Sequence, residues 1–177
     1  MAGELTALDR ETRAVERPDD HKTELRLWLR LLTCSTMIER EIRRRLREEF
    51  STTLPRFDLM AQLEKSPTGM TLGEVSRRLM VSNGNVTTVV AGLIDEGMLH
   101  KRTATHDRRI QVVSLTASGL RNFRLMAERH KEWIAELFAE LSPNDLAKAM
   151  QQLAQIKGSI QQSTARSNVA QQESERK

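Results

Sequence analysis

Residues 71–99, TLGEVSRRLMVSNGNVTTVVAGLIDEGML, decide the fold of this chain. Thr71 followed by Glu74 has the capping-box spacing that begins a helix. Ser82 is a good N-cap for a second helix, and Gly97 suits the left-handed position that follows a helix end. Two short helices separated by a brief break predict a helix-turn-helix.

A β-hairpin is predicted directly after these two helices. Residues 99–103 and 110–115 carry polar and apolar side chains with a period close to two, as half-buried strands do. The residues between them are polar, charged and turn-like. A hairpin with a charged tip, placed behind a helix-turn-helix, predicts a wing.

Longer helices are predicted on both sides of this lobe. Residues 22–50 carry apolar side chains in steps of three and four, and in the first half these surround much of the helix. Such a helix is expected to be buried on two sides, against its own domain and against a second subunit. A short helix is expected over residues 56–64, and longer ones over residues 116–141 and 143–160.

The expected fold is mainly α, of the α+β class: a winged helix-turn-helix lobe with long N- and C-terminal helices. The lobe is expected to span about residues 54–115. The predicted division is a flexible N-terminal arm (1–20), one domain (21–160) with long helices at about 22–50 and 116–160, and a polar C-terminal tail that frays (161–177).

Composition narrows the class of function. The 177 residues include 28 Lys and Arg against 24 Asp and Glu, so a net charge of +4 does not by itself identify a nucleic-acid binder. Aromatic residues make up 3% and Tyr is absent, which argues against binding RNA or single strands by base stacking. No apolar run approaches the ~20 residues of a membrane span and the first residues lack a signal core, so a soluble cytoplasmic protein is expected.

The order of the predicted elements, together with certain residues, resembles the MarR family of winged-helix regulators over about residues 25–160. The most specific part is Asp-Arg-Arg followed about six residues later by Leu-Thr-x-x-Gly. The residues that carry the resemblance are LGEVSRRL at 72–79, VTTVV at 86–90, LIDEGML at 93–99, KR at 101–102, DRR at 107–109 and VSLTASG at 113–119.

The resemblance implies a transcriptional regulator that binds double-stranded DNA as an obligate homodimer. Its dimerisation helices would be the first helix (about 22–50) and the last two (about 116–160), which interlock with those of the other subunit. It also implies an effector pocket between the dimerisation helices and the winged lobe, for small aromatic carboxylates or their coenzyme A thioesters. The stretch TLPRFDLM at residues 53–60 is most similar to regulators of aromatic-acid catabolism.

The start of the second helix of the motif is the candidate reader of the major groove, because recognition helices contact bases with their first turns. Asn can bond adenine at two points, a Thr methyl can pack on thymine, and a glycine lets the backbone come close. A helix start with free N–H groups also suits a phosphate. The candidates are Ser82, Asn83, Gly84, Asn85, Thr87 and Thr88. The alternative is that they are ordinary polar residues of a helix start.

The wing is the candidate reader of the minor groove. In the family pattern the second residue after the Asp, here Arg109, reaches into the groove, and Asp107 orients it by a salt bridge. A narrow A·T-rich groove attracts such an arginine. The other candidates are Arg102, His106 and Arg108 in the wing, and Arg77 and Arg78 of the preceding helix, which are expected to touch phosphates. The alternatives are a solvated charged hairpin and, for Arg77 and Arg78, a plain surface role.

An effector pocket needs apolar walls and, for an aromatic acid, one cation. The candidates are Trp28, Met37, Arg40, Phe57 and Met60. Each of them is also explained by a place in the core or in a subunit interface.

Three other classes of function compete with this one. Cys34 raises a thiol-based redox sensor as the alternative regulator, but its place on an apolar stripe predicts a buried structural thiol. The four histidines have no Cys or carboxylate at ligand spacing, and no nucleophile or phosphate-loop motif occurs, so neither an enzyme nor a metal or cofactor site is predicted. An architectural protein without sequence preference would not need the Asn and Thr face. The predicted function is a sequence-specific regulator, a repressor released by an aromatic carboxylate or its thioester on an inverted-repeat operator, with activation left open.

Overall fold

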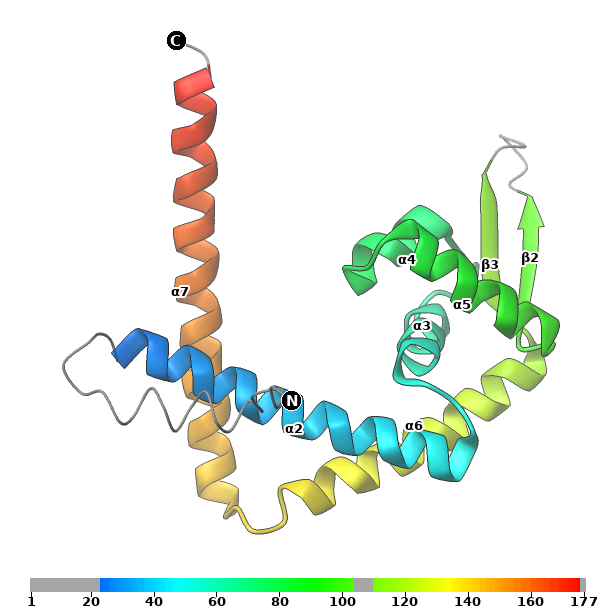
Figure 1. The fold of residues 1–177 in the computed structure, drawn as a ribbon, viewed down its shortest axis with the longest axis horizontal. Helices are drawn as coiled ribbons and strands as arrows, with labels where there is room; N and C mark the ends of the chain where they lie inside the picture. Colours follow the sequence, from blue (N-terminus) through cyan, green and yellow to red (C-terminus); the bar gives the residue numbers. More distant parts are fainter. Residues whose placement is uncertain (1–22, 104–109, 176–177) are drawn as a thin grey trace, which may run out of the picture. The chain divides into compact units, whose positions relative to one another are not determined.

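The computed structural model describes residues 23–103 and 110–175, and the chain forms two compact units that divide after Trp133. In these residues no helix combines the length and the apolar character that crossing a membrane requires. The helices are α2 (Thr23–Phe50), α3 (Leu54–Glu64), α4 (Leu72–Leu79), α5 (Asn83–Asp95), α6 (Ala117–Leu137) and α7 (Pro143–Glu175), and the strands are β1 (Met70–Thr71), β2 (Leu99–Thr103) and β3 (Gln111–Leu115) (Figure 1).

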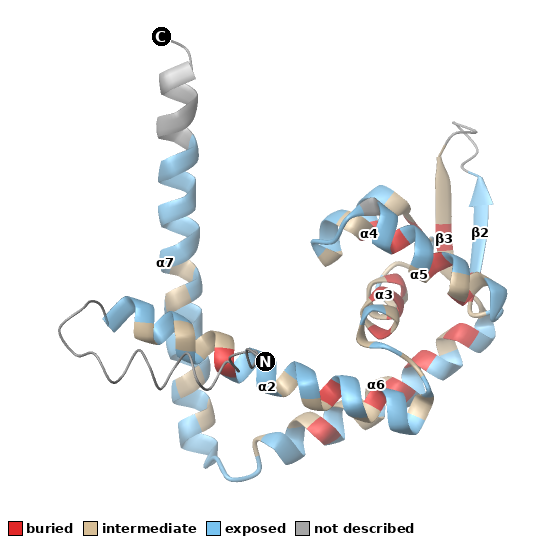
Figure 2. Cartoon of the chain, in the orientation of Figure 1, coloured by how far each residue is buried: buried red, intermediate tan, exposed pale blue. Residues whose placement is uncertain are grey.

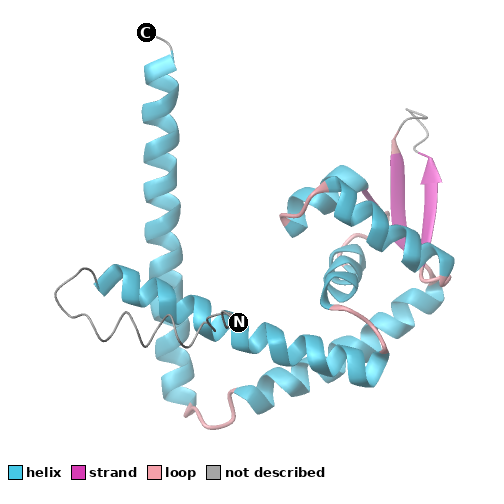
Figure 3. Ribbon diagram, in the orientation of Figure 1, coloured by secondary structure: helices cyan, strands magenta, loops and turns pink. Residues whose placement is uncertain are grey.

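The sheet has three antiparallel strands in the order β1-β3-β2 (Figure 3). Leu99 of β2 lies opposite Leu115 of β3, and Met70 of β1 lies opposite Val113 of β3. The predicted hairpin is therefore confirmed. The short strand β1 was not predicted, because two residues are too few to show a period of two.

Apolar side chains from α3, α4, α5 and the sheet form the core of the winged lobe. Val75 of α4 and Val113 of β3 are completely buried, and α5 presents its valine and leucine face to them. The other buried side chains of the lobe are Phe57, Leu59, Met60, Leu63, Met70, Val86, Val90, Leu93 and Leu99 (Figure 2). The predicted mainly α winged helix-turn-helix is confirmed.

The predicted start of α4 and the predicted end of α5 are confirmed as well. The Thr71 hydroxyl accepts from the backbone N–H of Glu74, and the Glu74 carboxylate accepts from the N–H of Thr71, which completes the capping box. Gly97 has φ +70° and follows α5. Its N–H donates to Ile94 and that of Met98 donates to Leu93, which is a Schellman motif.

A second cluster joins the end of α2 to α6. Trp133 is completely buried, and its indole N–H donates to the Glu49 carboxylate over 3.1 Å. The rings of Phe50 and Trp133 meet edge to face with centroids 6.1 Å apart. Arg129 donates to the same carboxylate and lies over the Trp133 ring. The last turn of α2 is therefore fixed to the middle of α6.

Two helix ends differ from the prediction. α6 ends at Leu137 rather than near residue 141, because the backbone closes into short turns in which the N–H of Ala139 donates to Glu136 and that of Leu141 to Phe138. α7 continues to Glu175, whereas the sequence predicted fraying after residue 160. Residues 161–175 contain neither Gly nor Pro, so a helix that has already formed can propagate through them.

The first half of α2 is more exposed in the single chain than predicted. The buried residues of α2 are Thr33, Ile42 and Leu46. Cys34, which was predicted to be buried, is exposed. Successive residues of a helix point about 100° apart, so Cys34 faces away from the side on which Thr33 is buried. The large apolar side chains left exposed on this helix are Leu25, Leu27, Trp28 and Met37.

Candidate DNA-binding surface

α5 has one apolar face and one polar face. Val86, Val90 and Leu93 are buried and hold the helix against the lobe. The opposite face of its first two turns is exposed and carries Gly84, Asn85, Thr87 and Thr88. The Thr88 hydroxyl donates to the Gly84 carbonyl over 3.2 Å, which leaves the Thr88 methyl group as a separate apolar surface. Because the core fixes one face of α5, the polar face has a defined direction.

The start of α5 has the geometry expected of a helix N-terminus. Ser82 is the N-cap, has extended backbone angles and accepts from the N–H of Asn85 over 3.4 Å. Asn83 is the first residue of the helix, and its side chain lies outside the described part of the structure. Of the residues predicted to read the major groove, Ser82, Gly84, Asn85, Thr87 and Thr88 are thus exposed on one short segment.

Two arginines lie beside this segment. Arg77 and Arg78 form the basic last turn of α4 and are exposed. Glu74 of the first turn has its pKa lowered, first by the hydrogen bond from the Thr71 backbone and to a smaller extent by these two arginines. Positive charge at the end of α4 is also favourable for the helix dipole. The two guanidinium groups extend the polar surface of α5 with charges that suit phosphates.

The far end of α5 is fixed by contacts that the sequence did not predict. The Thr116 hydroxyl donates to the Gly97 carbonyl over 2.8 Å, and the Ser118 hydroxyl donates to the same carbonyl over 3.1 Å. Arg56 of α3 forms an ion pair with Glu96, the C-cap residue of α5. Thr116 belongs to the VSLTASG stretch that was identified in the sequence, but nothing in the sequence indicated that its hydroxyl bonds to Gly97. These contacts tie α5 to α3 and to the start of α6.

The wing is described only at its base. β2 is exposed after Leu99, and Arg102 donates from Nη2 to the carbonyl of Thr68 over 2.9 Å. Arg102 therefore supports the turn before β1 in addition to any role toward DNA. The remaining wing candidates, His106, Asp107, Arg108 and Arg109, lie outside the described residues.

Comparison with known proteins agrees with this geometry. Residues 50–110 match the family model described as MarR family. A MarR family transcriptional regulator from Silicibacter pomeroyi has 33% sequence identity and a TM-score of 0.69, and the match covers 81% of this chain and 99% of that protein. The chain belongs to the MarR family. It is a DNA-binding transcriptional regulator of the winged-helix type.

Other relatives of this MarR family chain extend the comparison. The transcriptional activatory protein BadR of Rhodopseudomonas palustris is 29% identical over 149 residues, which cover 81% of this chain and 84% of BadR. Streptococcus pneumoniae FabT, solved in complex with DNA, has the same fold with 22% identity and a TM-score of 0.65 over 78% of this chain and 97% of that one.

The candidate effector residues of this MarR family chain fall into two groups. Phe57 and Met60 are buried in the core, where the Phe57 ring lies 5.5 Å from that of Phe123 and 5.0 Å from that of His130. The other three are exposed on α2: Trp28, Met37 and Arg40. None of these five residues lines the pocket at the base of the wing.

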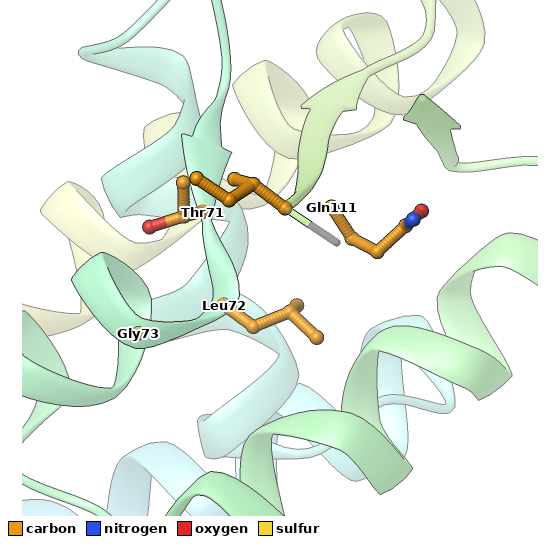
Figure 4. A pocket seen from close by; sticks show the side chains of 5 residues that line it. Thr71, Leu72, Gly73 and Gln111 are labelled. Atoms are coloured by element: carbon orange, nitrogen blue, oxygen red, sulfur yellow. The ribbon is translucent and has the colours of Figure 1, made fainter. Parts of the chain in front are cut away.

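A pocket of about 320 Å³ lies at the base of the wing, lined by Thr71, Leu72, Gly73, Ile110 and Gln111 (Figure 4). The Gln111 amide donates to the Thr103 hydroxyl over 3.3 Å, and the Glu74 carboxylate already caps the α4 N-terminus. This pocket therefore offers no free helix N-terminus to an anion. Within residues 23–103 and 110–175, no cluster of three or more His, Cys, Asp or Glu residues could hold a metal ion.

Proposed function

We propose that the protein regulates transcription by reading a specific DNA sequence, with the first two turns of α5 in the major groove. The supporting observation is the exposed polar face of Gly84, Asn85, Thr87 and Thr88 on a helix whose other face is buried. Amide and hydroxyl groups distinguish base edges, whereas charge alone does not. Arg77 and Arg78 would bind the flanking phosphates, and Arg109 with Asp107 would enter the minor groove.

We infer that the active form is a homodimer. Apolar side chains stand exposed at Leu25, Trp28 and Met37 in the first unit. In the second unit Leu141, before α7, and Met150, Leu153 and Ile160, within α7, are exposed, and the three residues of α7 have helical spacing. Large apolar surfaces of this kind mark interfaces. A two-fold dimer would present two copies of α5, which matches an inverted repeat with half-sites about one helical turn apart.

We propose further that the dimer represses by covering its operator, and that a small aromatic carboxylate or its coenzyme A thioester releases it. The support is the sequence similarity of residues 53–60 to regulators of aromatic-acid catabolism. BadR, by contrast, is named as an activatory protein. A reporter gene placed behind the selected operator distinguishes the two directions, since repression predicts more expression when the regulator is deleted.

The DNA-reading claim is tested by selecting duplexes from a random library with the wild-type protein. The Kd for the selected duplex and for a scrambled one is then measured at one fixed salt concentration. We expect Asn85→Ala to lose ~1–3 kcal/mol on the selected duplex, about 5- to 150-fold, and little on the scrambled one. The matched control is Gly92→Ala in the same helix, which keeps the wild-type ratio. Equal affinity of the wild-type protein for both duplexes rules out sequence-specific reading.

A thiol-based redox response is the second candidate, because Cys34 is exposed. An accessible thiol can be oxidised reversibly to a sulfenic acid or joined to another thiol. Peroxide would then weaken operator binding in the wild-type protein and leave Cys34→Ser unaffected. If peroxide changes operator binding equally in both proteins, Cys34 is not the redox sensor.

A further inference from the structure

Met80, in the turn between α4 and α5, combines two unusual properties. Its backbone is left-handed, with φ 54° and ψ 37°. Its side chain is 93% exposed. Residues other than Gly, Asn and Asp rarely adopt this conformation, because the Cβ atom crowds the following carbonyl group. Because the Met80 side chain is exposed to water, no burial of apolar surface compensates for this crowding.

The turn is held in this conformation by its neighbours. The Val81 N–H donates to the Ser76 carbonyl over 3.2 Å, and the Ser76 hydroxyl donates to the Val81 carbonyl over 2.6 Å. The Met80 N–H donates to the carbonyl of Arg77. Glycine would satisfy the same backbone bonds without strain. The local structure thus explains the left-handed turn but gives no reason for a methionine in it.

The position of Met80 supplies such a reason. Figures 2 and 3 show the α4–α5 loop at the outside of the lobe, where it leads directly into the first turn of α5. Arg77 and Arg78 precede Met80, and Ser82 and Asn85 follow it, and all four are exposed. Met80 is therefore an apolar group set among residues that suit phosphates and base edges.

We propose that the Met80 side chain contacts an apolar group of the DNA at the edge of the major groove and so adds to sequence recognition. The DNA offers two such groups, the C5-methyl of thymine and the deoxyribose ring. This inference rests on the proposed placement of α5. DNA fits the surroundings better than a protein partner does, because two exposed arginines precede Met80 and the polar start of α5 follows it, while the exposed Val81 beside Met80 adds only a small apolar surface.

The test uses three variants of the full-length protein and the selected duplex. Met80→Gly relieves the strained backbone, so its Tm is expected to rise. Its Kd for the selected duplex is expected to increase about fivefold or more, because the contact is gone. Met80→Asn, which also tolerates the left-handed conformation, is expected to bind as weakly as Met80→Gly. Met80→Leu keeps an apolar side chain and is expected to bind within about twofold of wild type.

Duplexes in which each thymine in turn is replaced by deoxyuridine identify the group contacted. A methyl contact predicts one position where the replacement weakens binding of the wild-type protein but does not further weaken binding of Met80→Gly. A deoxyribose contact predicts no such position, while Met80→Gly remains weaker than wild type on every duplex.

Wild-type affinity in both Met80→Gly and Met80→Asn overturns the inference. If Asn85→Ala still loses affinity in that case, the placement of α5 stands and only the role of Met80 is wrong. If Asn85→Ala also binds like wild type, the placement of α5 itself fails.

Discussion

The Thr116 hydroxyl lies 2.8 Å from the Gly97 carbonyl and donates to it, which joins the residue before α6 to the glycine that follows the C-cap of α5. The same hydroxyl accepts from the N–H of Gly119 over 2.8 Å, as an N-cap does. Gly119 packs so closely that a Cβ atom there would lie 2.0 Å from the Met98 carbonyl oxygen. One side chain thus begins the long helix α6 and fixes the position of the end of α5.

Thr116→Val keeps the shape of the side chain and removes its hydroxyl. We expect a loss of about 1–2 kcal/mol in the free energy of unfolding, because a helix cap is lost and the carbonyl groups of Gly97 and Met98 each lose a donor. Chemical denaturation measures this value. Thr164→Val is the control, since the Thr164 hydroxyl only donates to Ile160 in an exposed turn of α7. Equal stability of the two variants would contradict the role given to Thr116.

Glu49 is expected to stabilise the fold more through its hydrogen bond from the indole of Trp133 than through its ion pair with Arg129. Arg129 lies at the surface, where ion pairs contribute little, whereas Trp133 is completely buried. Glu49→Gln retains an oxygen that accepts from the indole and should lower the Tm only slightly. Glu49→Leu should lower it more than Arg129→Leu does. Thermal unfolding followed by circular dichroism measures the Tm of each variant. A lower Tm in Arg129→Leu than in Glu49→Leu would assign the stabilisation to the ion pair.

His130 predicts a pH dependence of stability. Burial against Phe57 lowers the pKa of the imidazole below its ordinary 6.5, so the unfolded chain binds a proton more readily than the folded one. The free energy of unfolding is therefore highest above pH 6.5 and decreases as the pH falls through 6.5 toward the folded-state pKa. His130→Leu should lack this part of the decrease, while His100→Gln, at an exposed position of β2, should retain it. An unchanged pH profile in His130→Leu contradicts the prediction.

What the sequence could predict was local. Thr71, Ser82, Gly97 and Thr116 act through bonds to residues a few positions away, so their patterns identified the helix ends correctly. The bond from Arg102 to Thr68 spans 34 positions and follows only from the sheet register. Non-local contacts of this kind leave no periodic signal.

The wrong prediction at Cys34 has a similar cause. The apolar stripes of α2 indicated which side chains avoid water, but not which of them the same chain covers. The predicted DNA-reading residues of α5 did fall on one exposed face, because a single buried face determines where the others point. The left-handed Met80 was visible in the sequence only as a break between two helices.

The central claim, that the first turns of α5 lie against DNA, is tested most directly by comparing Gly84→Ala with Gly92→Ala. At both glycines, no atom beyond the chain neighbours and the adjacent helix backbone lies within 4 Å of the position a Cβ atom would take, so both variants should fold, with stability equal to or above wild type. We predict that Gly84→Ala weakens binding to the selected duplex, because its methyl group meets the DNA, while Gly92→Ala binds like the wild-type protein. Wild-type affinity in Gly84→Ala would contradict the account.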